Sequence, residues 1–203
     1  MGKKSFWDRV SPVYDLFETA YNRKVFTGTG AAVAQMIAPS DKVLECACGT
    51  GAISTYIAEK CSRLTATDYS AGMLKQAAKK CRRYSNVRFC TADITDLKYR
   101  DGSFDKAVAG NVIHLLPEPQ KALQELERVV KPGGKIIIPT YINMSKGTGK
   151  LAVKALALIG ADFRRQFDMK SYKRFFADMG YKNVEYRIVE GRMPCAVAVI
   201  TKK

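Results

Sequence analysis

Three acidic residues in the first half of the chain, Glu45, Asp68 and Asp93, each follow a short apolar run. A glycine-rich turn at residues 49–51 comes after the first run. Such a turn lets the backbone approach a ligand closely, and the helix after it offers free N–H groups. One carboxylate can accept hydrogen bonds from both vicinal hydroxyls of a ribose, and another can accept one from an exocyclic amine. Each feature alone also fits an ordinary turn or a helix cap, but their order and spacing together predict a nucleoside site.

The surrounding sequence alternates between strand-like and helical patterns. Strands are predicted at 42–46, 63–67, 87–90, 104–109 and 135–138, and helices from 52 to about 60, over 70–78 and from Pro117 onwards. A Lys-Pro-Gly-Gly turn at 131–134 precedes the fifth strand. Strands separated by helices imply right-handed parallel crossovers. The runs at 184–189 and 196–200 leave no room for a helix between them, so they should pair antiparallel. The predicted fold is α/β, with a doubly wound, mostly parallel sheet, helices on both faces and an antiparallel C-terminal hairpin.

Open sheets of this kind bind ligands at the carboxyl ends of their strands. That rule selects the loops at 45–51, 68–73 and 93–94, which carry the three acidic residues. Ser70 follows the second of these strands, and we expect it to be the N-cap of the next helix.

Length and composition narrow the class of protein. The 203 residues suit one domain, and 34 basic against 19 acidic residues give a net charge of +15. The basic residues are spread out, which fits either a solvated surface or a polyanion site. Six cysteines and a single histidine do not form a Cys/His zinc motif, so no metal is expected. No signal peptide or membrane-spanning run is evident, which predicts a cytoplasmic protein with reduced thiols.

Longer motifs resemble those of the class I S-adenosylmethionine-dependent methyltransferases over about residues 5–140. Residues 43–51 resemble the family's acidic, glycine-rich first motif, residues 67–74 its ribose-binding loop, and residues 92–94 its adenine loop. Residues 103–115 resemble its fourth strand and the loop beside the methyl donor, and 131–134 its usual turn. The resemblance implies a Rossmann-like fold, one methyltransferase domain over residues 1–203, S-adenosylmethionine as cofactor and S-adenosylhomocysteine as product.

The resemblance also implies which residues hold the cofactor. Asp68 would bind the ribose, Asp93 would face the adenine amine with Ile94 against the ring, and Asn111 would line the methionine end. The family usually has glycine where this chain has Ala47, and because alanine favours φ below zero we expect a retained but tighter loop. The full predicted set is Glu45, Ala47, Cys48, Gly49, Gly51, Asp68, Tyr69, Met73, Asp93, Ile94 and Asn111.

The opening at residues 6–15 is similar to the start of the ubiquinone/menaquinone C-methyltransferases and of the bacterial phosphatidylethanolamine N-methyltransferases. In these groups an N-terminal helix closes over the cofactor. This implies a helical lid over residues 1–38, with Tyr14 either near the methionine end or packed on the core. An insertion at 141–167, near the substrate mouth, carries an apolar helical pattern at 149–159. Both segments are basic and amphipathic, so they could cover an apolar molecule, contact a membrane surface, or simply cover the sheet.

We therefore expect direct in-line methyl transfer to a small hydrophobic or lipid-like acceptor. A general base is optional in such a reaction. His114, just after the fourth strand, is a candidate base, with core packing as the alternative; Tyr14 is the other candidate catalytic residue. Tyr141, just after the fifth strand, lies either at the substrate mouth or in the core.

Two other functions remain open. The net charge would suit an RNA methyltransferase, but residues 109–113 lack the Asn/Asp-Pro-Pro-Tyr/Phe run of nucleic-acid amino methylation, and no appended RNA-binding module is evident. Nucleic acid is therefore the less favoured partner. A non-catalytic S-adenosylmethionine-binding protein is the second alternative, and only Ala47 argues for it.

Overall fold

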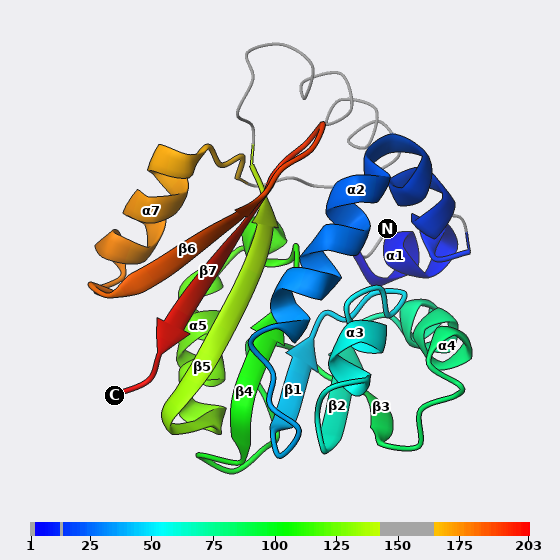
Figure 1. The fold of residues 1–203 in the computed structure, drawn as a ribbon, viewed down its shortest axis with the longest axis horizontal. Helices are drawn as coiled ribbons and strands as arrows, with labels where there is room; N and C mark the ends of the chain where they lie inside the picture. Colours follow the sequence, from blue (N-terminus) through cyan, green and yellow to red (C-terminus); the bar gives the residue numbers. More distant parts are fainter. Residues whose placement is uncertain (1–2, 13, 143–164) are drawn as a thin grey trace.

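The computed structural model describes the backbone of residues 3–12, 14–142 and 165–203, built around a seven-stranded sheet (Figure 1). The strand order is β3-β2-β1-β4-β5-β7-β6. The first five strands are parallel, and β7 pairs antiparallel with both β5 and β6, which confirms the predicted fold. The strands are β1 (Lys42–Cys46), β2 (Arg63–Asp68), β3 (Val87–Thr91), β4 (Phe104–Ala109), β5 (Val130–Tyr141), β6 (Val184–Val189) and β7 (Cys195–Thr201).

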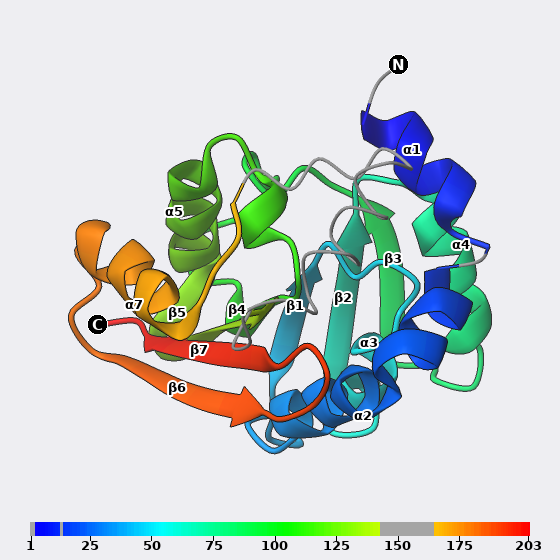
Figure 2. The ribbon, with the colours of Figure 1, turned by 90° about the horizontal axis from the view of Figure 1, so that it is seen from above.

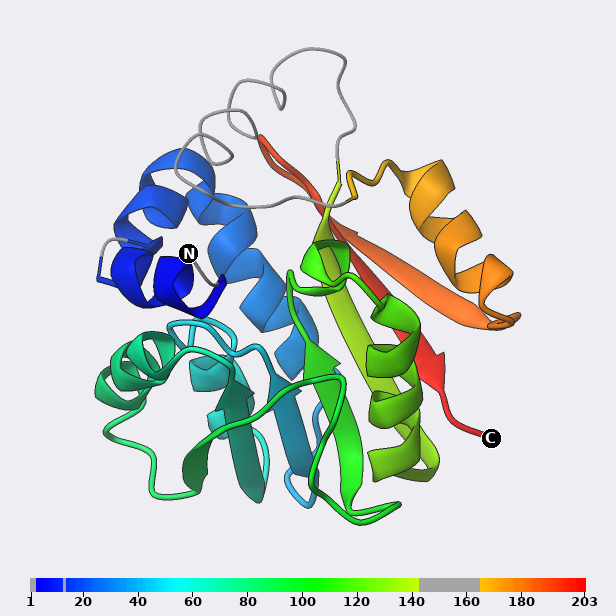
Figure 3. The same ribbon diagram turned by 180° about the vertical axis from the view of Figure 1, so that it is seen from behind.

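Helices cover both faces of the sheet. Seen from above, α5 (Pro119–Val129) and α7 (Met169–Asp178) lie on one face, and α2 (Tyr14–Ala34) and α3 (Ser54–Ala58) on the other (Figure 2). The view from behind shows α5 and α7 in front of the sheet (Figure 3). Helix α4 (Ala71–Lys80) follows β2, and α1 (Lys3–Val10) packs against α4. Among the described residues, no helix is long and apolar enough to cross a membrane.

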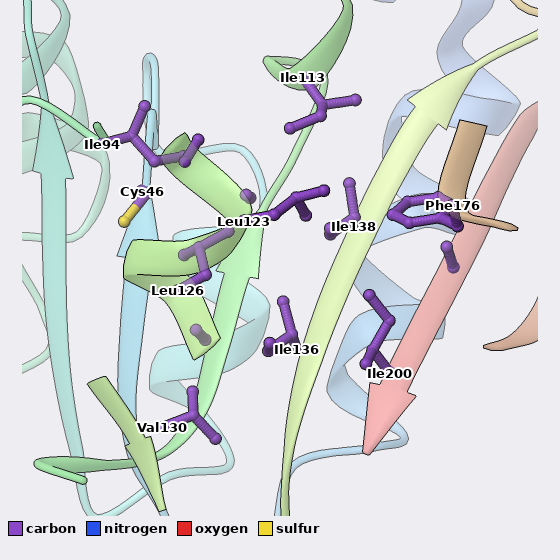
Figure 4. Packing of buried hydrophobic residues seen from close by; sticks show 14 of the residues in the cluster. Cys46, Ile94, Ile113, Leu123, Leu126, Val130, Ile136, Ile138, Phe176 and Ile200 are labelled. Carbon is purple, nitrogen blue, oxygen red and sulfur yellow. The ribbon is translucent and has the colours of Figure 1, made fainter. Parts of the chain in front are cut away.

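Strand β5 shows how alternation builds a separate core on each face. Ile136 and Ile138 pack with Leu123 and Leu126 of α5, while Ile137 belongs to the cluster under α2 and α3 (Figure 4). All three isoleucines are fully buried, because successive side chains of a strand point to opposite faces. This double burial holds the strand ends in a fixed register.

Three element boundaries differ from those expected. Helix α5 begins at Pro119, because the proline after Glu118 keeps Glu118 out of the helical conformation (φ −121°, ψ 72°). Helix α3 spans only Ser54–Ala58, since residues 51–53 form a turn. Residues 131–134 do not form a turn ahead of the fifth strand. They lie within β5, where its register with β4 shifts, and Gly133 there has φ +75°.

The carboxyl ends of β1, β2 and β4 lie side by side. Cys46 is in register with Thr67 on one side and with Ala109 on the other. The direction in which successive strands are added changes between β1 and β4. The chain adds β2 and β3 on one side of β1, and then adds β4 and β5 on the other side. Such a reversal opens a crevice at the strand ends.

Candidate active site

The loop after β1 takes a left-handed turn that corrects one expectation. Ala47 has φ +53°, not the negative φ expected for alanine, and Gly49 and Gly51 follow at +55° and +81°. The backbone of Cys48 is held by a hydrogen bond from its N–H to the carbonyl of Thr67, at 2.9 Å. The path of the loop therefore fixes the conformation at residue 47, and alanine adopts it at a cost.

Replacing Ala47 by glycine should stabilise the protein. Removing the strain of a left-handed alanine should stabilise the folded protein by about 1–2 kcal/mol. The greater conformational freedom of glycine in the unfolded chain offsets about 0.4–1 kcal/mol of this stabilisation. We expect the free energy of unfolding in urea to rise by about 0.5–1 kcal/mol. Ala52→Gly, in the turn that follows and without a positive φ, should lower it. A loss of stability in Ala47→Gly would contradict the strained loop.

Gly49 and Gly51 have different surroundings. A Cβ at Gly49 would meet nothing within 4 Å, and Gly49 lines the cleft described below. A Cβ at Gly51 would lie 3.0 Å from the Cα of Ala77 in α4. The structure thus places Gly51 against a helix, where it allows close packing, and not on the wall of the cleft.

Asp68 ends β2, and its carboxylate links the loop after β1 to the loop after β2. Its Oδ2 accepts a hydrogen bond from the N–H of Gly49 at 2.8 Å, and its Oδ1 accepts one from the N–H of Ser70 at 2.8 Å. Burial raises the pKa of this carboxyl above its ordinary value, and these N–H groups oppose the rise. Ser70 caps α4 by accepting a hydrogen bond from the N–H of Met73, which confirms the predicted N-cap. The carboxylate is therefore held in place by the backbone.

Asp93 follows β3 and is oriented by the next residues. Its Oδ1 accepts hydrogen bonds from the N–H and the hydroxyl of Thr95, at 2.8 and 2.7 Å. Its Oδ2 makes no hydrogen bond to any residue of the described ranges. Ile94 is buried beside it, with 7% of its surface exposed.

These residues meet in one cleft of about 440 Å³ at the carboxyl edge of the sheet. Eight of the eleven predicted cofactor residues line it: Ala47, Gly49, Asp68, Tyr69, Met73, Asp93, Ile94 and Asn111. The predicted set does not include the remaining lining residues, which are mostly apolar, although four of them lie within the predicted loops at 92–94 and 103–115. These remaining residues are Trp7, Ala92, Thr95, Gly110, Val112, Leu115, Leu116, Pro117 and Glu118.

A smaller chamber of about 70 Å³ adjoins the cleft and shares the walls at Ala47, Gly49, Gly110 and Asn111. Asn111 has φ +52°, and its Oδ1 accepts a hydrogen bond from the N–H of Tyr141 at 3.0 Å. Two further predicted residues, Glu45 and Cys48, line this chamber with Phe26, Thr29, Thr50, Ala52, Ile53 and Tyr141. Tyr141 is half-buried there, so it faces the site and also packs on the core.

Burial sets the protonation states of Glu45 and Cys48. It raises the pKa of the Cys48 thiol well above its ordinary value, so the thiol is neutral. It also raises the pKa of the Glu45 carboxyl to about 8, although a hydrogen bond from the Ser54 hydroxyl, 2.6 Å long, opposes the rise. In the free protein at neutral pH, Glu45 is mostly protonated.

Glu45 should therefore make stability fall as pH rises. The unfolded chain releases this proton near pH 4.5, whereas the folded protein keeps it to about pH 8. The stabilisation is complete below pH 4.5 and is lost between pH 4.5 and 8. We expect the Tm of the unaltered protein to fall over this range relative to that of Glu45→Gln. Parallel Tm curves for the two proteins would contradict the raised pKa.

Of the two predicted catalytic residues, the structure describes the side chain of His114 only. His114 is 7% exposed on the short 3-10 helix η1 (Ile113–Leu115) and is not one of the residues lining the cleft. Burial lowers the pKa of its imidazole to about 4, so the ring is neutral at neutral pH. Tyr14 begins α2, but its side chain is outside the described part of the chain. Their catalytic roles stay predictions.

Helix α1 is anchored beside the cleft. Asp8 Oδ1 accepts hydrogen bonds from the Ser70 hydroxyl and, at 2.9 Å, from the N–H of Gly72. A Cβ at Gly72 would lie 3.0 Å from the Cα of Asp8, so glycine allows the two helices to meet. The anchor places Trp7 on the cleft wall. Asp8 thus joins the N-terminal helix to the loop that carries Asp68.

Comparison with known proteins identifies the family. The family model described as "Methyltransferase domain" matches residues 44–138. The chain is 28% identical to the demethylmenaquinone methyltransferase of Renibacterium salmoninarum over 214 aligned residues, which cover 92% of this chain and 86% of that protein. The chain is a class I S-adenosylmethionine-dependent methyltransferase. Its methyl donor is S-adenosylmethionine, and S-adenosylhomocysteine is the product.

Solved structures support the same fold for the methyltransferase. An S-adenosylmethionine-dependent methyltransferase from Thermotoga maritima has a TM-score of 0.76 and 19% identity, covering 98% of this chain and 99% of that one. Magnesium protoporphyrin IX methyltransferase from Synechocystis, solved with S-adenosylhomocysteine, has a TM-score of 0.68 and 17% identity, covering 89% of this chain and 86% of that one.

The described residues contain no group of three or more His, Cys, Asp or Glu placed to hold a metal ion.

The methyltransferase's own residues fit the donor. Two carboxylates, Asp68 and Asp93, line the same cleft and suit a ribose and an amine, and the left-handed loop at residues 47–49 brings backbone to its wall. Tyr69 is 54% exposed on that wall and offers an aromatic face. These contacts to the donor remain our proposals, because they rest on the shape and chemistry of the site.

Proposed function

We propose that this methyltransferase transfers a methyl group to a ring carbon of a hydrophobic quinone in its reduced, quinol form. The observation that carries the proposal is the apolar wall of the cleft, formed by Val112, Leu115, Leu116 and Pro117 with Trp7 of α1. The Renibacterium relative, named for demethylmenaquinone, supports this class of acceptor. An apolar acceptor also supports contact with a membrane surface, to which the net charge of +15 would contribute.

Bound S-adenosylmethionine supplies a methyl group on a sulfonium centre, so the cofactor carries the reactivity. Transfer to a quinol ring carbon forms a C–C bond as the C–S bond breaks, and the ring carbon then releases its proton. The chain must align the two reactants and exclude water. Asp68, Asp93 and Tyr69 would orient the donor, and the apolar wall would hold the acceptor ring. No covalent bond to the protein is needed.

The proposed organisation is one domain with two covers over the cleft. The first is the N-terminal lid, residues 1–38, with Asp8 as its anchor. The second is the insertion at 141–167, of which residues 143–164 lie outside the described residues. Its returning end is fixed near the apolar wall, because the N–H of Arg165 donates to the carbonyl of His114 and its Nη1 donates to that of Leu116, at 3.1 and 2.7 Å.

The experiment offers several acceptors to the purified protein with methyl-labelled S-adenosylmethionine. Demethylmenaquinone is added oxidised and, under anaerobic conditions, chemically reduced; total RNA is added separately. We expect label in the solvent extract of the reduced sample only, with mass spectrometry placing one added methyl on the ring. Label in RNA alone would favour the RNA methyltransferase. Donor binding without transfer to any acceptor would favour the non-catalytic alternative.

A further inference from the structure

The small chamber is lined by a buried hydroxyl group that forms no hydrogen bond with the described residues. Thr29 of α2 is 3% exposed and lines the chamber, and its Oγ1 has no hydrogen-bond partner among the described residues. A helical threonine commonly donates to the carbonyl four residues earlier, as Thr27 does to Arg23 at 3.0 Å. A buried polar atom without a partner is unfavourable, so this hydroxyl is suited to a ligand group.

The position of Thr29 is fixed by the glycines on either side of it. A Cβ at Gly28 would lie 2.8 Å from Val189 of β6, and one at Gly30 would lie 2.3 Å from the ring of Tyr56 in α3. Through these close approaches, α2 packs tightly against β6 at Gly28 and against α3 at Gly30. The Thr29 side chain is therefore held in place before any ligand binds, which lowers the cost of binding.

The chamber has a carboxyl group and an ammonium group near it. Glu45 lines it, and Lys80 Nζ lies 3.4 Å from the hydroxyl of Thr50, another lining residue. The same ammonium is 5.9 Å from the ring centre of Phe26, which also lines the chamber. A zwitterion would find a carboxyl group for its ammonium and a positive wall for its carboxylate. The volume of about 70 Å³, against about 440 Å³ for the cleft, suits an amino-acid head but not a nucleoside.

The geometry points to Thr29 as a specificity residue that donates a hydrogen bond to the α-carboxylate of the donor's amino-acid end, on the side of the chamber near Lys80. Glu45 then faces the α-ammonium. The inference deepens the role of the donor site and does not depend on the identity of the acceptor proposed above.

The test compares two ligands that differ in the amino-acid end. S-adenosylhomocysteine carries it, and 5′-methylthioadenosine has the same nucleoside without it. By calorimetry, Thr29→Val should bind S-adenosylhomocysteine about 5- to 10-fold more weakly than the unaltered protein and bind 5′-methylthioadenosine equally well. Thr29→Ser, which keeps the hydroxyl, should retain most of the affinity. Thr27→Val, an exposed change two residues earlier on the same helix, should alter neither affinity.

Thr29→Val nearly conserves volume and removes the unpaired hydroxyl, so its Tm should equal or exceed that of the unaltered protein; this shows that the variant folds. Equal affinity of Thr29→Val and the unaltered protein for S-adenosylhomocysteine would overturn the inference. A parallel loss of affinity for 5′-methylthioadenosine would also overturn it, because the effect would then lie in the nucleoside cleft. No acceptor is present, so failure of the quinol proposal would leave these outcomes unchanged.

Discussion

Asp68→Ala is expected to weaken S-adenosylhomocysteine binding by about 10- to 150-fold, or ~1.5–3 kcal/mol. Two losses combine in this change. The proposed hydrogen bonds from the ribose hydroxyls are removed, and the N–H groups of Gly49 and Ser70 lose the acceptor that fixes their loops. Calorimetry with the purified protein measures the effect.

Asp96→Ala is the matched control for this change. Asp96 lies in the loop after β3, pairs with the exposed Lys98 at 2.5 Å and does not line the cleft. Its removal should leave affinity unchanged, since exposed ion pairs contribute little. Unchanged affinity in Asp68→Ala would show that the nucleoside lies elsewhere.

Asp8→Ala is expected to release α1 from the cleft. The change removes the acceptor for the Ser70 hydroxyl and the Gly72 N–H, which should shift the equilibrium between docked and undocked α1 by about 10- to 100-fold. Trp7 is the single tryptophan of the chain, so its fluorescence reports on this helix alone. We expect emission at longer wavelength, faster proteolysis before residue 22, and lower kcat/KM for methyl transfer because water enters the site.

Asp178→Ala serves as the comparison, because Asp178 is exposed at the end of α7, whereas α1 packs against α4. It should leave Trp7 emission unchanged. Identical emission spectra for Asp8→Ala and the unaltered protein would mean that this carboxylate does not hold the helix.

The sequence predicts most of the fold because local patterns and sheet burial agree. The strand prediction at 104–109 matches β4, since the run is apolar enough to be buried on both faces, and 184–189 matches β6. The start of α5 was misplaced because Pro117 and Pro119 both suit a first helical turn, and only the conformation of Glu118 decides between them. At Ala47, local preference gave the wrong φ because the surrounding loop contacts outweigh it.

The candidate site also contains residues that could be predicted from the sequence and residues that could not. Residues that directly follow strands, such as Asp68 and Asp93, could be predicted, because parallel strand ends share one edge. Trp7, Asp8 and Thr29 could not, because they reach the site on helices whose placement depends on tertiary contacts. Asp8 carries no local signal apart from its polar character. The two glycines beside Thr29 are such a signal, but only the packing against Tyr56 and Val189 gives them meaning.

The order of the last two strands bears on how the protein is made. Strand β6 joins the sheet only through β7, which comes later in the chain and lies between β6 and β5. During synthesis, β6 therefore emerges before the strand that connects it to the rest of the sheet. Until β7 follows, the growing chain exposes unpaired strand edges, including the isoleucine-rich edge of β5. The nascent protein therefore exposes an aggregation-prone edge until residues 195–201 pair with both β5 and β6.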